Sequence, residues 1–157
     1  MTPSFSLIEA RTPEALRQAF ALRHRVFVDE QGIPAALDAD GRDDASRHVL
    51  IRDGAVPVAT GRVTPGPDGA AVLARIAVAP AYRGQGLGRR VVEALETLAR
   101  EDGARRAVLH AHAYLERFYA AMGYVTEPEE TEAGGYRLVT MGKTLRAAGG
   151  AAPPEGG

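Results

Sequence analysis

The sequence predicts one α/β (α+β) domain, in which a mixed and mostly antiparallel sheet of six to seven strands is flanked by about four helices. Two observations lead to this prediction. Three apolar runs joined by short turns fill the first half of the chain, a pattern typical of successive antiparallel strands. A glycine-rich turn then opens an amphipathic helix, after which apolar segments alternate with helical ones. The length of 157 residues is usual for a single domain.

The N-terminal segment predicts a strand followed by a helix. Residues 5–10 form a short apolar run, and Thr12 can cap a helix that has Pro13 in its first turn. The helical pattern continues to about Asp29 and ends at Gln31-Gly32-Ile33-Pro34.

An acidic segment, residues 35–47, follows this helix and is expected to be a loop. Its carboxylates are Asp38, Asp40, Asp43 and Asp44. Such a run is most often a solvated loop, and the alternative is a surface that attracts a cationic substrate before reaction.

Three antiparallel strands are predicted next. They are His48–Arg52, Val56–Val63 and Ala71–Val78. Asp53-Gly54 between the first two is a strong hairpin signal, and residues 65–69, rich in proline and glycine, make the second turn.

The second half begins with Arg83-Gly84-Gln85-Gly86-Leu87-Gly88, which opens a helix that ends at Asp102-Gly103. A short buried strand, Ala107–Leu109, and a helix from about Ala113 to Met122 come next.

Two last strands, Tyr124–Thr126 and Tyr136–Lys143, are expected around an acidic turn, Glu127–Glu132. Residues 147–157 are nearly all alanine, glycine and proline, so we expect a domain of residues 1–146 and a disordered tail.

Composition and charge argue against several classes of protein. A hydrophobic fraction of 45% and a charged fraction of 25% are typical of a globular enzyme, and the net charge of −1 argues against a nucleic-acid partner. The chain has no cysteine, which excludes disulfides, thiolate metal sites and a cysteine nucleophile. It shows neither a signal peptide nor an apolar run near the roughly 20 residues that span a bilayer, so we expect a cytoplasmic protein without a membrane partner.

The glycine-rich turn predicts a phosphate site, because free N–H groups at a helix N-terminus bind anions and glycines let the backbone approach them. The dinucleotide fingerprint does not fit, since Arg89 stands where its third glycine belongs. A P-loop ending at Gly142-Lys143-Thr144 does not fit either, because Arg137 replaces its first glycine.

A third motif fits at every position. Residues 76–89, Ile-Ala-Val-Ala-Pro-Ala-Tyr-Arg-Gly-Gln-Gly-Leu-Gly-Arg, resemble the acyl-CoA signature of the GNAT family of N-acetyltransferases, Arg/Gln-x-x-Gly-x-Gly/Ala. Residues 113–124 are similar to the helix that follows it in the family and ends in Tyr-x-x-x-Gly-Phe/Tyr. With the preceding hairpin, the resemblance covers roughly residues 5–145.

The block from Arg23 to Pro34 is more particular. It resembles the Arg-x-x-Val-Phe-Val-x-Glu-Gln-Gly-Ile-Pro stretch of the ElaA-like bacterial subgroup. One departure concerns the residue before the second helix, which is Asn in many members or Gln in the subgroup but is His112 here.

The resemblance implies an N-acyltransferase in which a primary amine attacks the thioester of acetyl-CoA directly. The backbone N–H of Val78 would stabilise the oxyanion, and Tyr119 would protonate the leaving thiolate. The positions matching the cofactor-binding residues of the family are Ile76, Ala77, Val78, Arg83, Gly84, Gln85, Gly86, Leu87, Gly88, Arg89, His112 and Tyr119. The structural alternatives are an ordinary strand–helix turn and, for Tyr119, a core aromatic.

The general base has several candidates. Glu30 lies where the first helix ends, near the acceptor side of this architecture, although a solvated carboxylate is an equally good interpretation. His110, on the same strand face as His112, could relay a proton, although a satisfied buried histidine is an equally good interpretation, and a water chain is a further candidate. The two histidines lack a third ligand at a suggestive spacing, so we expect no metal.

Two other functions stay open: a non-catalytic acyl-CoA sensor, and an enzyme like the acyl-homoserine-lactone synthases, which share a similar Arg-x-x-Val-Phe block. The acceptor is a small-molecule amine or a protein N-terminus or lysine, since loops build acceptor pockets and carry no readable code. Homodimers are common in the family, although no residue pattern here indicates one.

Overall fold

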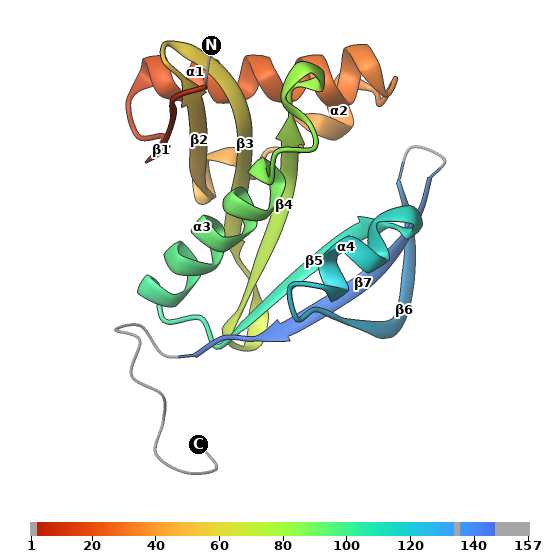
Figure 1. Ribbon diagram of the computed structural model, residues 1–157. Coiled ribbons are helices and arrows are strands. Elements are labelled where there is room, and N and C mark those ends of the chain that lie inside the picture. Colours follow the sequence, from red (N-terminus) through yellow and green to blue (C-terminus); the bar gives the residue numbers. More distant parts are fainter. Residues whose placement is uncertain (1–2, 134–135, 147–157) are drawn as a thin grey trace.

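The computed structural model describes residues 3–133 and 136–146. In this part of the chain seven strands form one sheet, in the spatial order β1-β2-β3-β4-β5-β7-β6 (Figure 1). The strands are β1 (Phe5–Glu9), β2 (Arg47–Asp53), β3 (Val56–Pro65), β4 (Ala70–Val78), β5 (Arg106–His112), β6 (Val125–Ala133) and β7 (Tyr136–Thr144). The α-helices are α1 (Pro13–Arg23), α2 (Ala35–Asp38), α3 (Leu87–Glu101) and α4 (Glu116–Ala120). This architecture confirms the predicted fold class.

The candidate site lies at the one place where the antiparallel pairing of the described strands is interrupted. Strands β4 and β5 pair in parallel, while every other recorded pair is antiparallel. The parallel ladder runs only from Ala70↔Arg106 to Leu73↔Leu109, although β4 continues to Val78 and β5 to His112. The two strands therefore meet at one end and separate toward the other, as Figure 1 shows.

Helices α1 and α3 cover opposite faces of the sheet. Leu50 of β2 packs with Ala15 and Ala19 of α1, whereas its neighbours Val49 and Ile51 pack in the large core with α3. Successive strand residues point to opposite faces, so the two helices lie on different sides. Helix α4 contributes to the same core as α3.

The first helix differs from its prediction in its last turns. Regular α-helix ends at Arg23, and residues 24–30 continue as a π-helical segment, η1 (His24–Glu30). The wider turn buries Val26 in the core while the next residue, Phe27, lines a cavity. Such π segments occur frequently at functional sites.

The acidic segment is not the plain loop that the sequence suggested. It holds α2 and a 3₁₀ turn, η2 (Asp43–Ala45), and β2 already begins at Arg47. Arginines from three other elements bind its carboxylates, which explains its order.

The acidic turn predicted at 127–132 is also wrong. These residues belong to β6, which pairs with β7 from Val125↔Gly142 to Ala133↔Tyr136 across a register shift. The pairing with β7 overrides the low strand preference of glutamate.

The remaining elements differ only in their bounds. The strand predicted at 107–109 extends through Arg106–His112, and the helix expected at 113–122 is a 3₁₀ turn (Ala113–Leu115) followed by α4. The expected tail, 147–157, lies outside the described residues. No helix within the described ranges is both long and apolar enough to cross a membrane.

Candidate active site

The glycine-rich turn has the geometry of an open anion site. Gly84 and Gly86 have φ values of 82° and 79°, a left-handed conformation that only glycine adopts readily. A Cβ atom at either position would meet nothing within 4 Å, so the turn is open. Gly86 is the N-cap of α3, and no side chain of the described residues caps this helix. The first N–H groups of a 15-residue helix therefore face an open turn.

The other residues of the turn divide into exposed and buried ones. Gln85 and Arg89 are exposed, and Arg89 pairs with Glu93 at 3.3 Å. Leu87 and Ala77 are buried in the core, so only their backbones can contact a ligand. Gly88 lies against Phe118, where a Cβ would come within 3.3 Å of the ring, and thereby lets α3 approach α4.

Arg83 connects the turn to two other candidate residues. Its Nη1 and Nη2 donate to the carboxylate of Glu30, both at 2.7 Å, and its Nε donates to the carbonyl of Val78 at 3.0 Å. The hydrogen bonds from Arg83 lower the pKa of Glu30 below its ordinary value. The structure therefore brings the predicted base and the phosphate turn together, and both side chains are exposed.

The backbone of Val78 is directed into the opening of the sheet. The N–H of Ala79 donates to the carbonyl of Val58 in β3 at 2.8 Å. The N–H groups of successive residues in a strand point to opposite sides, so the N–H of Val78 faces away from β3. On that side β5 has already diverged.

A cavity of about 450 Å³ lies where β4 and β5 separate. Its lining is largely apolar and includes Phe27, Ile33, Leu37, Ile76 and Leu115. The same cavity is lined by the predicted residues Tyr119 and His112, and by His110. Residues of η1, of both separated strands and of α4 therefore line the same cavity.

Tyr119 is a buried tyrosine whose ring lines this cavity. It is 6% exposed, and burial raises the pKa of its hydroxyl to about 12, with a smaller contribution from Tyr114. The hydroxyl therefore stays protonated at neutral pH and can donate a hydrogen bond or a proton. The rings of Phe118 and Tyr124 pack edge-on against it at 5.0 and 6.0 Å.

The two histidines of β5 lie in different surroundings. His112 stacks on Tyr114 with ring centroids 5.3 Å apart, and burial lowers its pKa below the usual value. Its imidazole is therefore neutral at pH 7. His110 is exposed, and its Nδ1 lies 3.1 Å from the hydroxyl of Thr140.

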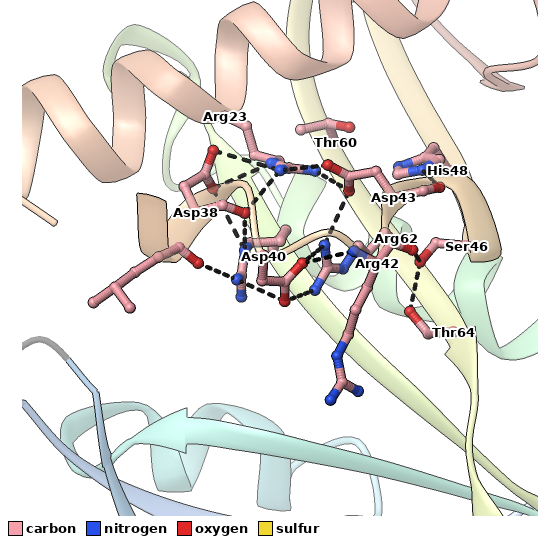
Figure 2. Close-up of polar contacts among 12 residues, drawn as sticks. Arg23, Asp38, Asp40, Arg42, Asp43, Ser46, His48, Thr60, Arg62 and Thr64 are labelled. Atoms are coloured by element: carbon pink, nitrogen blue, oxygen red, sulfur yellow. Dashed lines mark hydrogen bonds and ion pairs between the residues drawn. The ribbon is translucent and has the colours of Figure 1, made fainter. Parts of the chain in front are cut away.

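A cluster of ion pairs, shown in Figure 2, holds the acidic segment, whose Leu37 and Asp38 line the cavity. We call it the arginine–aspartate cluster; its members are Arg23, Arg62, Arg75, Asp38, Asp40 and Asp43. Arg23 binds Asp38 at 3.2 Å and Asp43 at 2.7 Å. Arg62 binds Asp40 at 2.7 Å and Asp43 at 2.9 Å.

The charges of the cluster are largely removed from water. Arg23 and Arg62 are each 3% exposed. Hydrogen bonds from Arg62 hold the pKa of Asp40 well below its usual range. Burial raises the pKa of Asp43, but its hydrogen bonds to Arg23 and Arg62 outweigh that effect and lower it. The carboxylates of Asp38, Asp40 and Asp43 are consequently paired within the protein, whereas Asp44 of the same segment is exposed.

The sequence did not indicate this cluster or the lining by Phe27, Ile33 and Leu37. One signal was present: Arg62 and Arg75 interrupt otherwise apolar strands, and an acidic segment of opposite charge lies nearby in the chain. Buried arginines need carboxylate partners, so the two features could have been matched. Within the described ranges no group of histidine, aspartate and glutamate is suited to hold a metal ion.

The comparisons with known proteins agree with this geometry. The model of the acetyltransferase (GNAT) family matches residues 13–124. The uncharacterized N-acetyltransferase YjcF of Bacillus subtilis is 37% identical over 127 residues, which cover 80% of this chain and 90% of YjcF.

Two solved structures extend the comparison. Escherichia coli ElaA has a TM-score of 0.76 at 28% identity, with 90% of this chain and 99% of that chain covered. N-acetylglutamate synthase from Neisseria gonorrhoeae, solved with coenzyme A and N-acetyl-glutamate, has a TM-score of 0.71 at 17% identity, covering 93% of this chain and 36% of that one. At that identity the second likeness concerns the fold.

Proposed function

The chain belongs to the acetyltransferase (GNAT) family, and from this premise we propose that it transfers an acetyl group from acetyl-CoA to a primary amine in a ternary complex. One observation carries the proposal: the open glycine turn adjoins the same gap between β4 and β5 that contains the cavity lined by Tyr119. The turn that would bind the phosphates therefore lies next to the cavity that would hold the reacting groups. We assign the activity to a domain of residues 1–146.

The described residues fit acetyl-CoA at the turn. Backbone N–H groups after Gly84 and Gly86 would receive the pyrophosphate, and Arg83 and Arg89 would add positive charge beside it on exchanging their exposed partners, Glu30 and Glu93, for the phosphates. The N-acetylglutamate synthase of similar fold binds coenzyme A, which supports the assignment. The pantetheine arm would then extend between the separated strands along Ile76 and Val78.

Two groups of this chain would act on the thioester. The N–H of Val78 donates to the thioester oxygen as negative charge develops there. The Tyr119 hydroxyl, which is protonated at neutral pH as in any tyrosine, donates its proton to the sulfur as the carbon–sulfur bond breaks. The amine nitrogen forms the new bond to the carbonyl carbon, and holding both reactants in one cavity supplies much of the rate.

The amine must lose a proton, and two groups can receive it. His112 lines the cavity and its imidazole is neutral, so it can accept a proton, although burial lowers its pKa and makes it a weaker base than an exposed histidine. Glu30 remains a candidate, but its bond to Arg83 lowers its pKa and makes it a weaker base than a free carboxylate. A cofactor phosphate that engaged Arg83 would release Glu30 for this role.

The cavity favours an acceptor in which the amine is attached to an apolar group. Phe27, Ile33 and Leu37 form the wall contributed by the N-terminal segments, and the charged residues of the lining, Asp38 and Arg75, are already paired. An aromatic or aliphatic amine would therefore bury apolar surface there, whereas a second positive charge would lose its hydration.

The test is calorimetric titration with acetyl-CoA, followed by measurement of thiol release in the presence of 2-phenylethylamine or 1,5-diaminopentane. Micromolar binding with faster release for the phenyl compound supports the proposal. Binding without thiol release from a broad panel of amines would indicate an acyl-CoA sensor. Absence of binding by acetyl-CoA and longer acyl-CoAs would refute the proposal.

A further inference from the structure

Arg75 adopts a backbone conformation that an arginine avoids. It lies within β4 with φ of 58°, and Asp68 is the one other non-glycine residue with positive φ in the described part of the chain. The left-handed region is unfavourable for residues with a Cβ, and such strain is found mainly at functional sites. The pairing of β3 with β4 is irregular close by, between Thr60 and Arg62.

The guanidinium of Arg75 reaches from β4 to the acidic segment. Nη2 donates to the carbonyl of Leu37 at 2.8 Å and to Oδ2 of Asp40 at 3.3 Å. Nε donates to the carbonyl of Asp38 at 3.3 Å. These bonds tie the end of α2 to the strand whose backbone would contact the thioester.

None of these partners depends on Arg75 for its hydrogen bonding. Asp38 is bound by Arg23, through both its carboxylate and its carbonyl, and Asp40 is bound by Arg62. The bond from Arg75 to the carbonyl of Leu37 is exposed, so water can replace it. Burial also lowers the pKa of Arg75, which indicates that its surroundings disfavour the charge. Stability alone therefore does not explain an arginine at a position suited to glycine.

The position of the Arg75 hydrogen bonds explains the presence of this arginine better than stability does. Leu37 and Asp38 line the cavity on one side, and Ala74, Arg75 and Ile76 line it from β4. The distance between these two walls is fixed through the guanidinium.

We propose that Arg75 is a positioning residue, which holds the Leu37–Asp38 wall at a fixed distance from β4 and so determines how tightly the acceptor amine is bound. This inference rests on the proposed acetyl transfer. Arg75 is not itself assigned a contact with either reactant.

The experiment compares Arg75→Gly with Asp68→Gly. Both variants relieve the same backbone strain, but Asp68 lies in the exposed turn after β3 and contributes nothing to the cavity. For Arg75→Gly we expect the KM for 2-phenylethylamine, or for the amine that the wild type acylates fastest, to rise about 10-fold, while the dissociation constant of acetyl-CoA changes less than about 2-fold. Asp68→Gly should retain both constants.

Two further measurements separate positioning from a general loss of structure. Hydrogen exchange of residues 35–45 should become faster in Arg75→Gly, while exchange in α3 stays unchanged. Methylguanidinium at millimolar concentration should partly restore the KM of Arg75→Gly and leave Asp68→Gly unaffected.

An unchanged acceptor KM in Arg75→Gly, or unchanged exchange in residues 35–45, would overturn the inference even if the wild type transfers acetyl groups. A wild type that neither binds acetyl-CoA nor releases thiol would instead overturn the proposed function. In that case the exchange experiment still tests the link between β4 and the acidic segment.

Discussion

The glycine turn and the acidic segment both belong to the candidate active site, and they are constructed differently. The turn offers backbone N–H groups at open glycines, with exposed arginines beside them. The acidic segment is held by buried arginines that form ion pairs with its carboxylates, and of the Arg62 nitrogens only Nε is buried without a hydrogen-bond partner among the described residues. A ligand can thus supply hydrogen-bond acceptors to the N–H groups of the glycine turn. The acidic segment is already held by ion pairs and can serve as a fixed wall.

The difference predicts what each region loses when it is changed. Substitutions in the glycine turn should affect ligand affinity first and cost folding mainly the strain of a positive φ, because the space around these glycines is open. Substitutions in the arginine–aspartate cluster should affect folding first, because they leave charges without partners away from water. Each of the following experiments pairs a change in one region with a matched change elsewhere.

The largest effect is expected for Arg62→Met. Arg62 is 3% exposed and binds Asp40 and Asp43, so its removal should lower the free energy of unfolding by about 3 kcal/mol, near the low end for a broken buried pair. The low end applies because Asp43 keeps Arg23 and Asp40 is partly exposed. Urea unfolding followed by circular dichroism measures the change.

The matched control is Arg89→Met in the first turn of α3, where the arginine is 56% exposed. It should change stability by less than about 0.5 kcal/mol and weaken acetyl-CoA binding severalfold. Equal losses of stability in Arg62→Met and Arg89→Met would show that the two regions do not differ in this way.

Gly86→Trp should weaken acetyl-CoA binding by at least about 100-fold, because an indole at the N-cap of α3 blocks the approach of phosphate to the first N–H groups. Gly41→Trp, in the acidic segment, is its control. Gly41 also has positive φ, 82°, and open space around its Cβ position. It should show similar backbone strain with unchanged affinity in calorimetric titration. Equal loss of affinity in both variants would mean that strain, not the phosphate site, is responsible.

Tyr119→Phe should lower kcat about 100-fold while acetyl-CoA affinity is retained, since only the proton donor is removed. Tyr124→Phe tests whether any buried tyrosine hydroxyl matters. The Tyr124 hydroxyl donates to Glu96 at 2.8 Å in the core, away from the cavity lining. Its loss should reduce thermal stability and preserve kcat. Retained turnover in Tyr119→Phe would remove that residue from the mechanism.

The same contrast explains what the sequence could reveal. The glycine turn is a local motif, in which Gly84, Gly86 and the helix that follows are adjacent in the chain, so its spacing alone predicted it. The arginine–aspartate cluster joins residues as far apart as Asp38 and Arg75 through the sheet, and no local pattern encodes that contact. The strands were predicted because alternation and turns are local, whereas the extension of β6 through 127–132 depends on its partner β7. The π-helical turns of η1 likewise escaped a periodicity analysis, since one widened turn hardly alters the apolar pattern.

The smallest expected effect concerns pH, and it belongs to the acidic segment. Hydrogen bonds from Arg62 lower the pKa of Asp40, so the folded state binds its proton less readily than the unfolded chain. The stabilisation from this carboxylate is therefore fully present above its ordinary pKa near 4 and is lost as the pH falls below that value. Asp40→Asn should lower the free energy of unfolding by about 1–2 kcal/mol at pH 7, and this difference from the wild type should shrink as the pH approaches 2.

Asp44→Asn is the matched change for this last comparison, because Asp44 is an exposed aspartate of the same segment. It should alter stability by less than about 0.5 kcal/mol throughout the range. Urea unfolding of both variants and of the wild type at several pH values measures the differences. A difference for Asp40→Asn that stays constant with pH would mean that the ion pair with Arg62 contributes little, and that packing rather than charge holds the wall of the cavity. The acidic segment would then resemble an ordinary core region, and the contrast with the glycine turn would concern burial alone.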